Sequence, residues 1–154
     1  MVKFEHILCP TDFSEPAKKA LEYACELTAQ YGAELHLLHV LPDPVAALTA
    51  YGPVVSAIPA DWEENMRTQV NQQLAEVLEK SWEQGKKVQR AISEGVPFAE
   101  IIRYAKDHAI DLIVMGTHGR TGFNHLIMGS EAEKVVRQAP CPVLTIAPEE
   151  SKNR

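Results

Sequence analysis

Two patterns of apolar and polar positions alternate along the chain. Short apolar runs, typical of strands buried in a parallel sheet, occupy residues 4–9, 35–40, 88–93, 112–115 and 143–147. Between them, apolar side chains recur every three or four residues, which predicts helices over 14–31, 61–85, 97–109 and 130–139. Strands that alternate with helices predict an α/β fold: a single doubly wound domain, with a five-stranded parallel sheet and helices on both faces.

Local signals mark where the helices begin and end. Ser14 is placed to cap the first helix, and Gly32 follows its last turn. Asp61, with Glu64 three residues later, is typical of a capping box at the start of a long helix that Gly85 ends. The proline-rich stretch 41–60 predicts a long irregular connection of the kind that is often functional.

The order of elements also predicts where a ligand would bind. Doubly wound sheets bind ligands beyond the carboxyl ends of their strands, where the strand order reverses, so the loops after the first, second and fourth strands are candidates. We expect one domain over residues 1–148 and a polar tail over 149–154.

Composition excludes several classes of partner. The chain has 154 residues and a formal charge of −6, from 15 basic and 21 acidic residues, which disfavours nucleic acid as a ligand. No apolar run approaches the roughly 18–20 residues that span a membrane, and the first residues do not resemble a signal peptide. Cys9, Cys25 and Cys141 are odd in number and far apart, so we expect buried thiols in a reducing, cytoplasmic environment.

The segment from Gly116 to Gly129 carries the clearest chemical signal. Gly116 and Gly119 follow a buried strand, where glycine permits close approach of the backbone to an anion and tolerates positive φ. Gly129 and Ser130 lead into a helix whose first N–H groups and dipole favour phosphate. The alternative is that the glycines only shape a tight turn, with Ser130 and Glu133 as a capping box.

The spacing Gly116-x-x-Gly119, nine residues, then Gly129-Ser130 resembles the G-x-x-G-x9-G-[ST] signature of the universal stress protein family. Neither a Walker A motif nor the dinucleotide fingerprint G-x-G-x-x-G is present in this loop. The resemblance extends over almost the whole chain, through the segments 7–14, 37–40, 95–97, 111–119 and 139–144.

The resemblance implies a binding site for ATP, ADP or AMP with Mg²⁺ or Mn²⁺. Residues that it places near the adenosine or along the pocket are Pro10, Thr11, Asp12, Val40, Met115 and Gly116. Residues that it places at the phosphates are Gly119, Arg120, Gly129 and Ser130, with His118 able to add positive charge. Asp12 would hold a ribose hydroxyl or the metal ion, although alone it is as readily explained as a turn carboxylate.

Glu131 departs from the expected pattern. A carboxylate in the first turn stabilises the helix but repels a bound phosphate. Either it points away from the nucleotide or it helps to hold the metal ion.

Three functions compete. The first is an ATP-binding stress-response protein acting as a sensor or regulator; the others are a slow ATPase or nucleotidyl-transfer enzyme, and an interaction module with a vestigial site. No catalytic residue is assigned, because the sequence has no P-loop lysine and no placed general base beyond Asp12, so we expect at most slow hydrolysis. The apolar strand 143–147 carries no charge to discourage edge pairing, which predicts a homodimer; the protein partner downstream is unknown.

The remaining histidines do not predict a metal site. His36 and His39 are three residues apart on a strand, so their side chains face opposite sides of the sheet. We expect His6 and His108 to lie at the surface.

Overall fold

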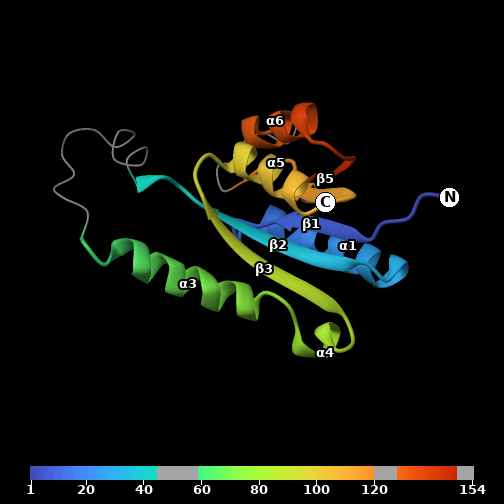
Figure 1. Ribbon diagram of the computed structural model, residues 1–154, viewed down its shortest axis with the longest axis horizontal. Coiled ribbons are helices and arrows are strands. Elements are labelled where there is room, and N and C mark those ends of the chain that lie inside the picture. The colour runs from blue at the N-terminus through green and yellow to red at the C-terminus, as the bar shows by residue number, and fades with distance from the viewer. Residues whose placement is uncertain (45–58, 120–127, 149–154) are drawn as a thin grey trace, which may run out of the picture.

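The computed structural model describes residues 1–44, 59–119 and 128–148 (Figure 1). Its sheet has five parallel strands in the order β3-β2-β1-β4-β5. The strands are β1 (His6–Pro10), β2 (Glu34–Leu41), β3 (Lys87–Glu94), β4 (Leu112–Gly116) and β5 (Val143–Ile146). The helices are α1 (Glu15–Tyr31), α3 (Trp62–Glu76), α4 (Lys80–Glu83), α5 (Pro97–Asp107) and α6 (Ser130–Gln138).

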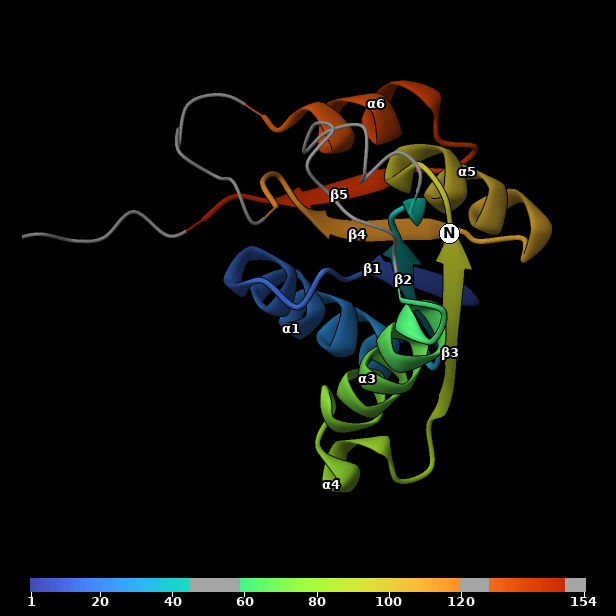
Figure 2. The same ribbon diagram turned by 90° about the vertical axis from the view of Figure 1, so that its left-hand side faces the viewer.

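The sheet separates two apolar cores. Successive residues of a strand point to opposite faces, so Ile7 and Cys9 of β1 pack with α1 and α3, whereas Leu8 packs with α5 and α6. Figures 1 and 2 show α5 and α6 on one side of the sheet and α1 and α3 on the other. The predicted doubly wound α/β domain is therefore confirmed.

The caps of the first helix are also confirmed. The Ser14 hydroxyl accepts a hydrogen bond from the Ala17 N–H at 3.3 Å. Gly32 has φ 64°, the left-handed conformation that ends helices without a Cβ penalty. The first strand, however, begins at His6 and not at residue 4.

The single long helix predicted over 61–85 is wrong, because α3 ends at Glu76 and α4 is a separate turn. The Arg90 Nε–H of β3 donates to the Leu74 carbonyl at 2.7 Å, which takes an acceptor that a continuing helix would use. The predicted capping box at Asp61 is wrong as well, because the Asp61 side chain makes no capping hydrogen bond.

The cysteines are all free thiols, but only Cys9 is fully buried; Cys25 and Cys141 are half-buried. Burial raises the pKa of the Cys25 thiol to about 11, so it remains protonated at neutral pH. Among the residues that the structure describes, every helix is too short or too polar to span a bilayer.

Candidate functional site

A cleft of about 360 Å³ lies at the carboxyl ends of β1, β2 and β4. The strand order reverses between β1 and β4, so the loops after these two strands diverge and leave space between them. The volume falls within the ~300–1,000 Å³ typical of small-molecule sites. Eleven of the twelve predicted binding residues line it: Pro10, Thr11, Asp12, Val40, Met115, Gly116, His118, Gly119, Gly129, Ser130 and Glu131.

Arg120, the twelfth predicted residue, lies outside the described residues, as do most of the predicted irregular connection 41–60 and the tail 149–154. The imidazole of His118 lies with Nδ1 2.8 Å from the Thr117 hydroxyl, so its neighbour orients the ring at the cleft.

The loop after β1 is held by hydrogen bonds on both sides. The Thr11 N–H donates to the Leu38 carbonyl at 2.8 Å, and the Thr11 carbonyl accepts from His39 Nδ1 at 2.8 Å. Asp12 Oδ1 accepts from the Ser14 N–H at 3.0 Å and also from the Ser14 hydroxyl. Asp12 therefore serves as a turn carboxylate through one oxygen.

Its other oxygen faces the glycine loop. A Cβ placed on Gly119 would lie 3.1 Å from Asp12 Oδ2, which is tighter than ordinary contact. The two loops thus approach closely enough for one small anion or cation to contact both. Asp12 combines a structural role with a position at the cleft.

Lack of space, and not positive φ, explains the glycine at 129. Gly129 has φ −61°, which any residue adopts. Its N–H donates to the Thr117 carbonyl at 2.7 Å, and a Cβ on Gly129 would lie 3.0 Å from that oxygen. A larger residue would push the start of α6 away from the loop after β4.

The amino end of α6 opens onto the cleft. Gly129 is the N-cap and Ser130 the first helical residue. No side chain of the residues that the structure describes caps this end, so the alternative capping box of Ser130 and Glu133 does not form. The first N–H groups of a helix have no acceptors within the helix. With the helix dipole, they favour an anion in the cleft.

Glu131 points toward α5. Its Oε2 accepts a hydrogen bond from the Phe98 N–H at 2.8 Å, so the carboxylate caps the first turn of α5 and ties the two helices together. This contact explains how an acidic residue can lie beside a phosphate site: its carboxylate is directed at the α5 backbone. Phe98 is also covered by Lys134, whose Nζ lies 4.8 Å from the ring centroid.

The floor of the cleft is apolar. Met115 is 8% exposed, and Ala132 of α6 is 3% exposed; both pack with Leu38. Pro97 and Ile101 of α5 also line the cleft, and our sequence reasoning did not assign them to the site. The spacing of Ile101 on an amphipathic helix indicates only a core position, whereas Pro97 follows Gly95 in a segment that already resembled the family.

Known proteins are similar to this chain over almost its whole length. Residues 3–147 match the model of the universal stress protein family. The chain belongs to this family. A universal stress protein of Methanocaldococcus jannaschii, MJ0531, is 33% identical over 147 residues, which cover 93% of this chain and 82% of the relative. YxiE of Bacillus subtilis is 31% identical over 147 residues, 93% of this chain and 99% of the relative.

Solved structures share the architecture of this universal stress protein. The structure of MJ0577 from M. jannaschii has a TM-score of 0.81 and 28% identity, and the match covers 97% of this chain and 100% of that chain. A universal stress protein in complex with cAMP has a TM-score of 0.71, with 17% identity over 96% of this chain and 100% of that chain. One from Archaeoglobus fulgidus in complex with dAMP has a TM-score of 0.62, with 18% identity over 95% and 99%.

Proposed function

We propose that this protein binds ATP in the cleft above β1 and β4 and acts as a nucleotide-dependent regulator in a cytoplasmic stress response. The observation that carries the proposal is the arrangement of Gly119 and Gly129. A Cβ on Gly119 would lie 3.1 Å from Asp12 Oδ2, and one on Gly129 would lie 3.0 Å from the Thr117 carbonyl oxygen, so both positions are crowded. Both residues also line the cleft beside the amino end of α6. Backbone N–H groups presented in this way form a site for phosphate.

Each part of the nucleotide has a matching surface. The apolar floor, with Val40 and Met115, suits the adenine ring, and the loop from Pro10 to Asp12 suits the ribose. The phosphates would lie against Gly119, Gly129 and Ser130, with His118 and Arg120 contributing charge. Two universal stress proteins of this fold were solved in complex with cAMP and with dAMP. This supports an adenine nucleotide as the ligand.

A divalent cation fits the same site. Mg²⁺ is commonly held by one or two carboxylates together with substrate phosphates and water. Asp12 presents Oδ2 toward Gly119, and therefore toward the proposed phosphates, while Oδ1 binds Ser14. Mg²⁺ or Mn²⁺ at Asp12 would offset the charge of the phosphates.

We propose that the regulator is a homodimer formed through β5. This strand lies at the edge of the sheet. Its Leu144 is 37% exposed, and Val136 of α6 is 45% exposed. Antiparallel pairing with a second copy would satisfy the outward backbone groups and cover Leu144.

Calorimetric titration of the purified protein with ATP and Mg²⁺ tests the nucleotide proposal. We expect one site per chain, and mass spectrometry of protein purified without added nucleotide should detect an adenine nucleotide. Gly129→Val should weaken ATP binding by about thirtyfold, or about 2 kcal/mol, because the new side chain collides with the Thr117 carbonyl.

Glu133→Gln is the control for this variant, because it alters the same helix at a surface residue that pairs with Arg137 and does not line the cleft. It should bind ATP within a fewfold of the wild-type protein. Equal affinity in Gly129→Val and the wild type, with both folded by circular dichroism, would contradict the phosphate-loop assignment.

A further inference from the structure

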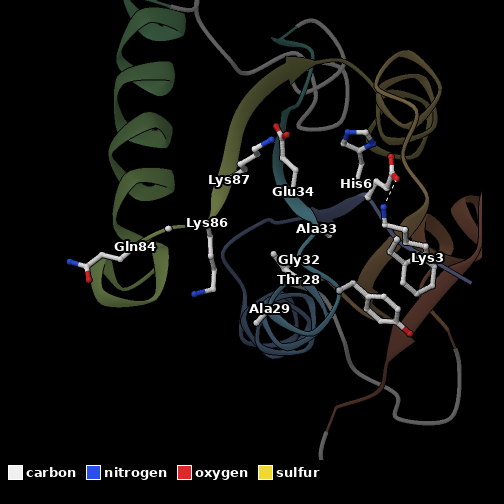
Figure 3. Close-up of a pocket in the computed structure, with 14 residues that line it drawn as sticks. Lys3, His6, Thr28, Ala29, Gly32, Ala33, Glu34, Gln84, Lys86 and Lys87 are labelled. Atoms are coloured by element: carbon white, nitrogen blue, oxygen red, sulfur yellow. Dashed lines mark hydrogen bonds and ion pairs between the residues drawn. The ribbon is translucent and has the colours of Figure 1, made fainter.

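A second polar cluster lies at the opposite end of the sheet, where β1 and β2 begin. Glu34 and His36 are two residues apart on β2, so their side chains share a face. His6 of β1 is the direct register partner of Glu34, which brings all three onto the face covered by α5. In Figure 3 the side chains of His6 and Glu34 rise from neighbouring strands on the side away from α1.

The three side chains converge to within reach of one metal ion. One ligand atom from each of His6, Glu34 and His36 lies within 4.8 Å of the other two. His36 Nε2 and Glu34 Oε1 are 3.7 Å apart. Two ligands bound about 2.1 Å from a tetrahedral zinc ion lie about 3.4 Å apart, so closure requires only a small movement of His6.

The buried ring of His36 supplies an independent signal. The residue is 3% exposed, and its Nε2 has no hydrogen-bond partner among the residues that the structure describes. Buried polar atoms without partners are rare in folded proteins, and each requires an explanation. His36 Nδ1 lies 2.9 Å from the Tyr104 hydroxyl, which fits a tautomer that donates from Nδ1 and leaves a lone pair on Nε2 facing Glu34.

We propose that His6, Glu34 and His36 bind a divalent transition-metal ion of the zinc class. Two imidazoles and one carboxylate are ligands that Zn²⁺, Co²⁺ and Ni²⁺ accept readily, whereas Mg²⁺ and Ca²⁺ prefer sites made of oxygen. Three protein ligands leave a fourth position, which water can fill because the side chains of His6 and Glu34 are partly exposed.

The surroundings already orient the ligands. Asp111 Oδ2 accepts from the backbone N–H groups of Glu5 and His6 at 2.7 and 2.9 Å, which fixes the start of β1. Tyr104 holds His36 from the other side, and the ring of Tyr104 stacks on His108 at 3.7 Å between centroids. Such outer contacts are typical of metal-binding histidines and raise affinity.

A bound ion would join β1 to β2 and, through Tyr104, would couple both strands to α5. The amino end of α5 borders the cleft at the other end of the sheet. The metal site uses none of the proposed nucleotide residues, so either site can exist without the other.

Titration of the full chain, freed of tags and metals, with CoCl₂ and ZnCl₂ tests this proposal. We expect one ion per chain, intense visible d–d absorption typical of four-coordinate Co²⁺, and displacement of Co²⁺ by Zn²⁺ but not by excess Mg²⁺. Zinc at a hundredfold excess over its Kd should raise Tm by about 5 °C or more.

Conservative variants locate the ion. Glu34→Gln and His6→Gln should each lower zinc affinity at least tenfold, because each removes a ligand at a partly exposed position that tolerates the change. Glu5→Gln is the matched control, since it removes an exposed neighbouring carboxylate that pairs with Lys3; its affinity should stay within twofold of the wild type. Absence of zinc binding in the wild-type protein, or unchanged affinity in Glu34→Gln and His6→Gln, overturns the proposal.

Discussion

Individual residues in this protein often serve two partners, which their types alone do not reveal. Asp12 accepts from Ser14 through one oxygen and turns the other toward Gly119. Glu131 lies in the first turn of α6 but caps α5. Ser14 is a local partner of Asp12, whereas only the folded chain brings Gly119 close to Asp12 and Phe98 close to Glu131.

The contact between Glu131 and Phe98 leads to a prediction for Glu131→Gln. A neutral amide makes a weaker hydrogen bond than a carboxylate and interacts less with the dipole of α5, so stability should fall by about 1 kcal/mol. ATP affinity should stay constant or increase, because a negative charge near the phosphates is removed. Urea denaturation and calorimetry measure the two quantities on the same sample.

Glu133→Gln provides the control, because Glu133 lies on the same helix and pairs with Arg137 at the surface. Surface pairs of this kind contribute little, so its stability should stay close to that of the wild type. A tenfold loss of ATP affinity in Glu131→Gln would show that Glu131 holds the metal ion, contrary to our assignment.

At the scale of elements, periodicity predicted which segments become helices and strands, and tertiary contacts decided where several of them end. Val70, Leu74 and Leu78 all lie in the same apolar core, as one long helix would require. The helix nevertheless ends at Glu76, where Arg90 of β3 binds the Leu74 carbonyl. No local signal could show this contact, because its two residues belong to different elements.

The edge strand β5 leads to a second prediction. The Pro142 carbonyl accepts from the Ile113 N–H of β4, and the Ile146 carbonyl accepts from the N–H of Thr117, just after β4. Because backbone groups alternate in direction along a strand, those of Val143 and Thr145 point outward. Thr145→Pro should therefore remove an outward N–H without breaking the pairing with β4. The loss of two such hydrogen bonds per dimer, at about 1 kcal/mol each, would weaken dimerisation about thirtyfold.

Sedimentation or light scattering at micromolar concentration measures this effect. Thr145→Ala keeps the N–H and should remain as dimeric as the wild type. A wild-type protein that is monomeric at micromolar concentration would refute pairing through β5.

At the scale of the whole molecule, the proposed ATP site is suited to holding the nucleotide rather than consuming it. Its phosphate contacts are chiefly backbone N–H groups, which bind the ground and transition states alike and therefore do not raise the chemical rate. Fast phosphoryl transfer also requires a positioned nucleophile and charges that stabilise the transition state.

We therefore predict ATP turnover far below the ~1–100 s⁻¹ of kinases. Release of phosphate under saturating ATP and Mg²⁺ measures it, and Asp12→Asn should weaken binding of the metal-bound nucleotide. Hydrolysis at several per second by the wild type, lost in Asp12→Asn, would place the protein among the enzymes instead.

The sequence by itself determined the alternation of elements, the doubly wound class and the end of the sheet where the cleft forms. These features follow from local periodicity and from rules of chain connection, which depend on residues close together in sequence. The strand order β3-β2-β1-β4-β5 then placed the loops after β1 and β4 side by side, as expected for this topology.

Only the tertiary structure decided which polar side chains bind residues remote in sequence. It paired Glu131 with Phe98, across 33 positions. It also brought His36 beside His6 and His108, which we had expected only to lie at the surface. It also showed that Gly129 is required by a nearby carbonyl and not by its φ. These outcomes depend on distances between segments that are remote in sequence. The packing of the two cores against the sheet sets those distances, and local sequence patterns do not encode them.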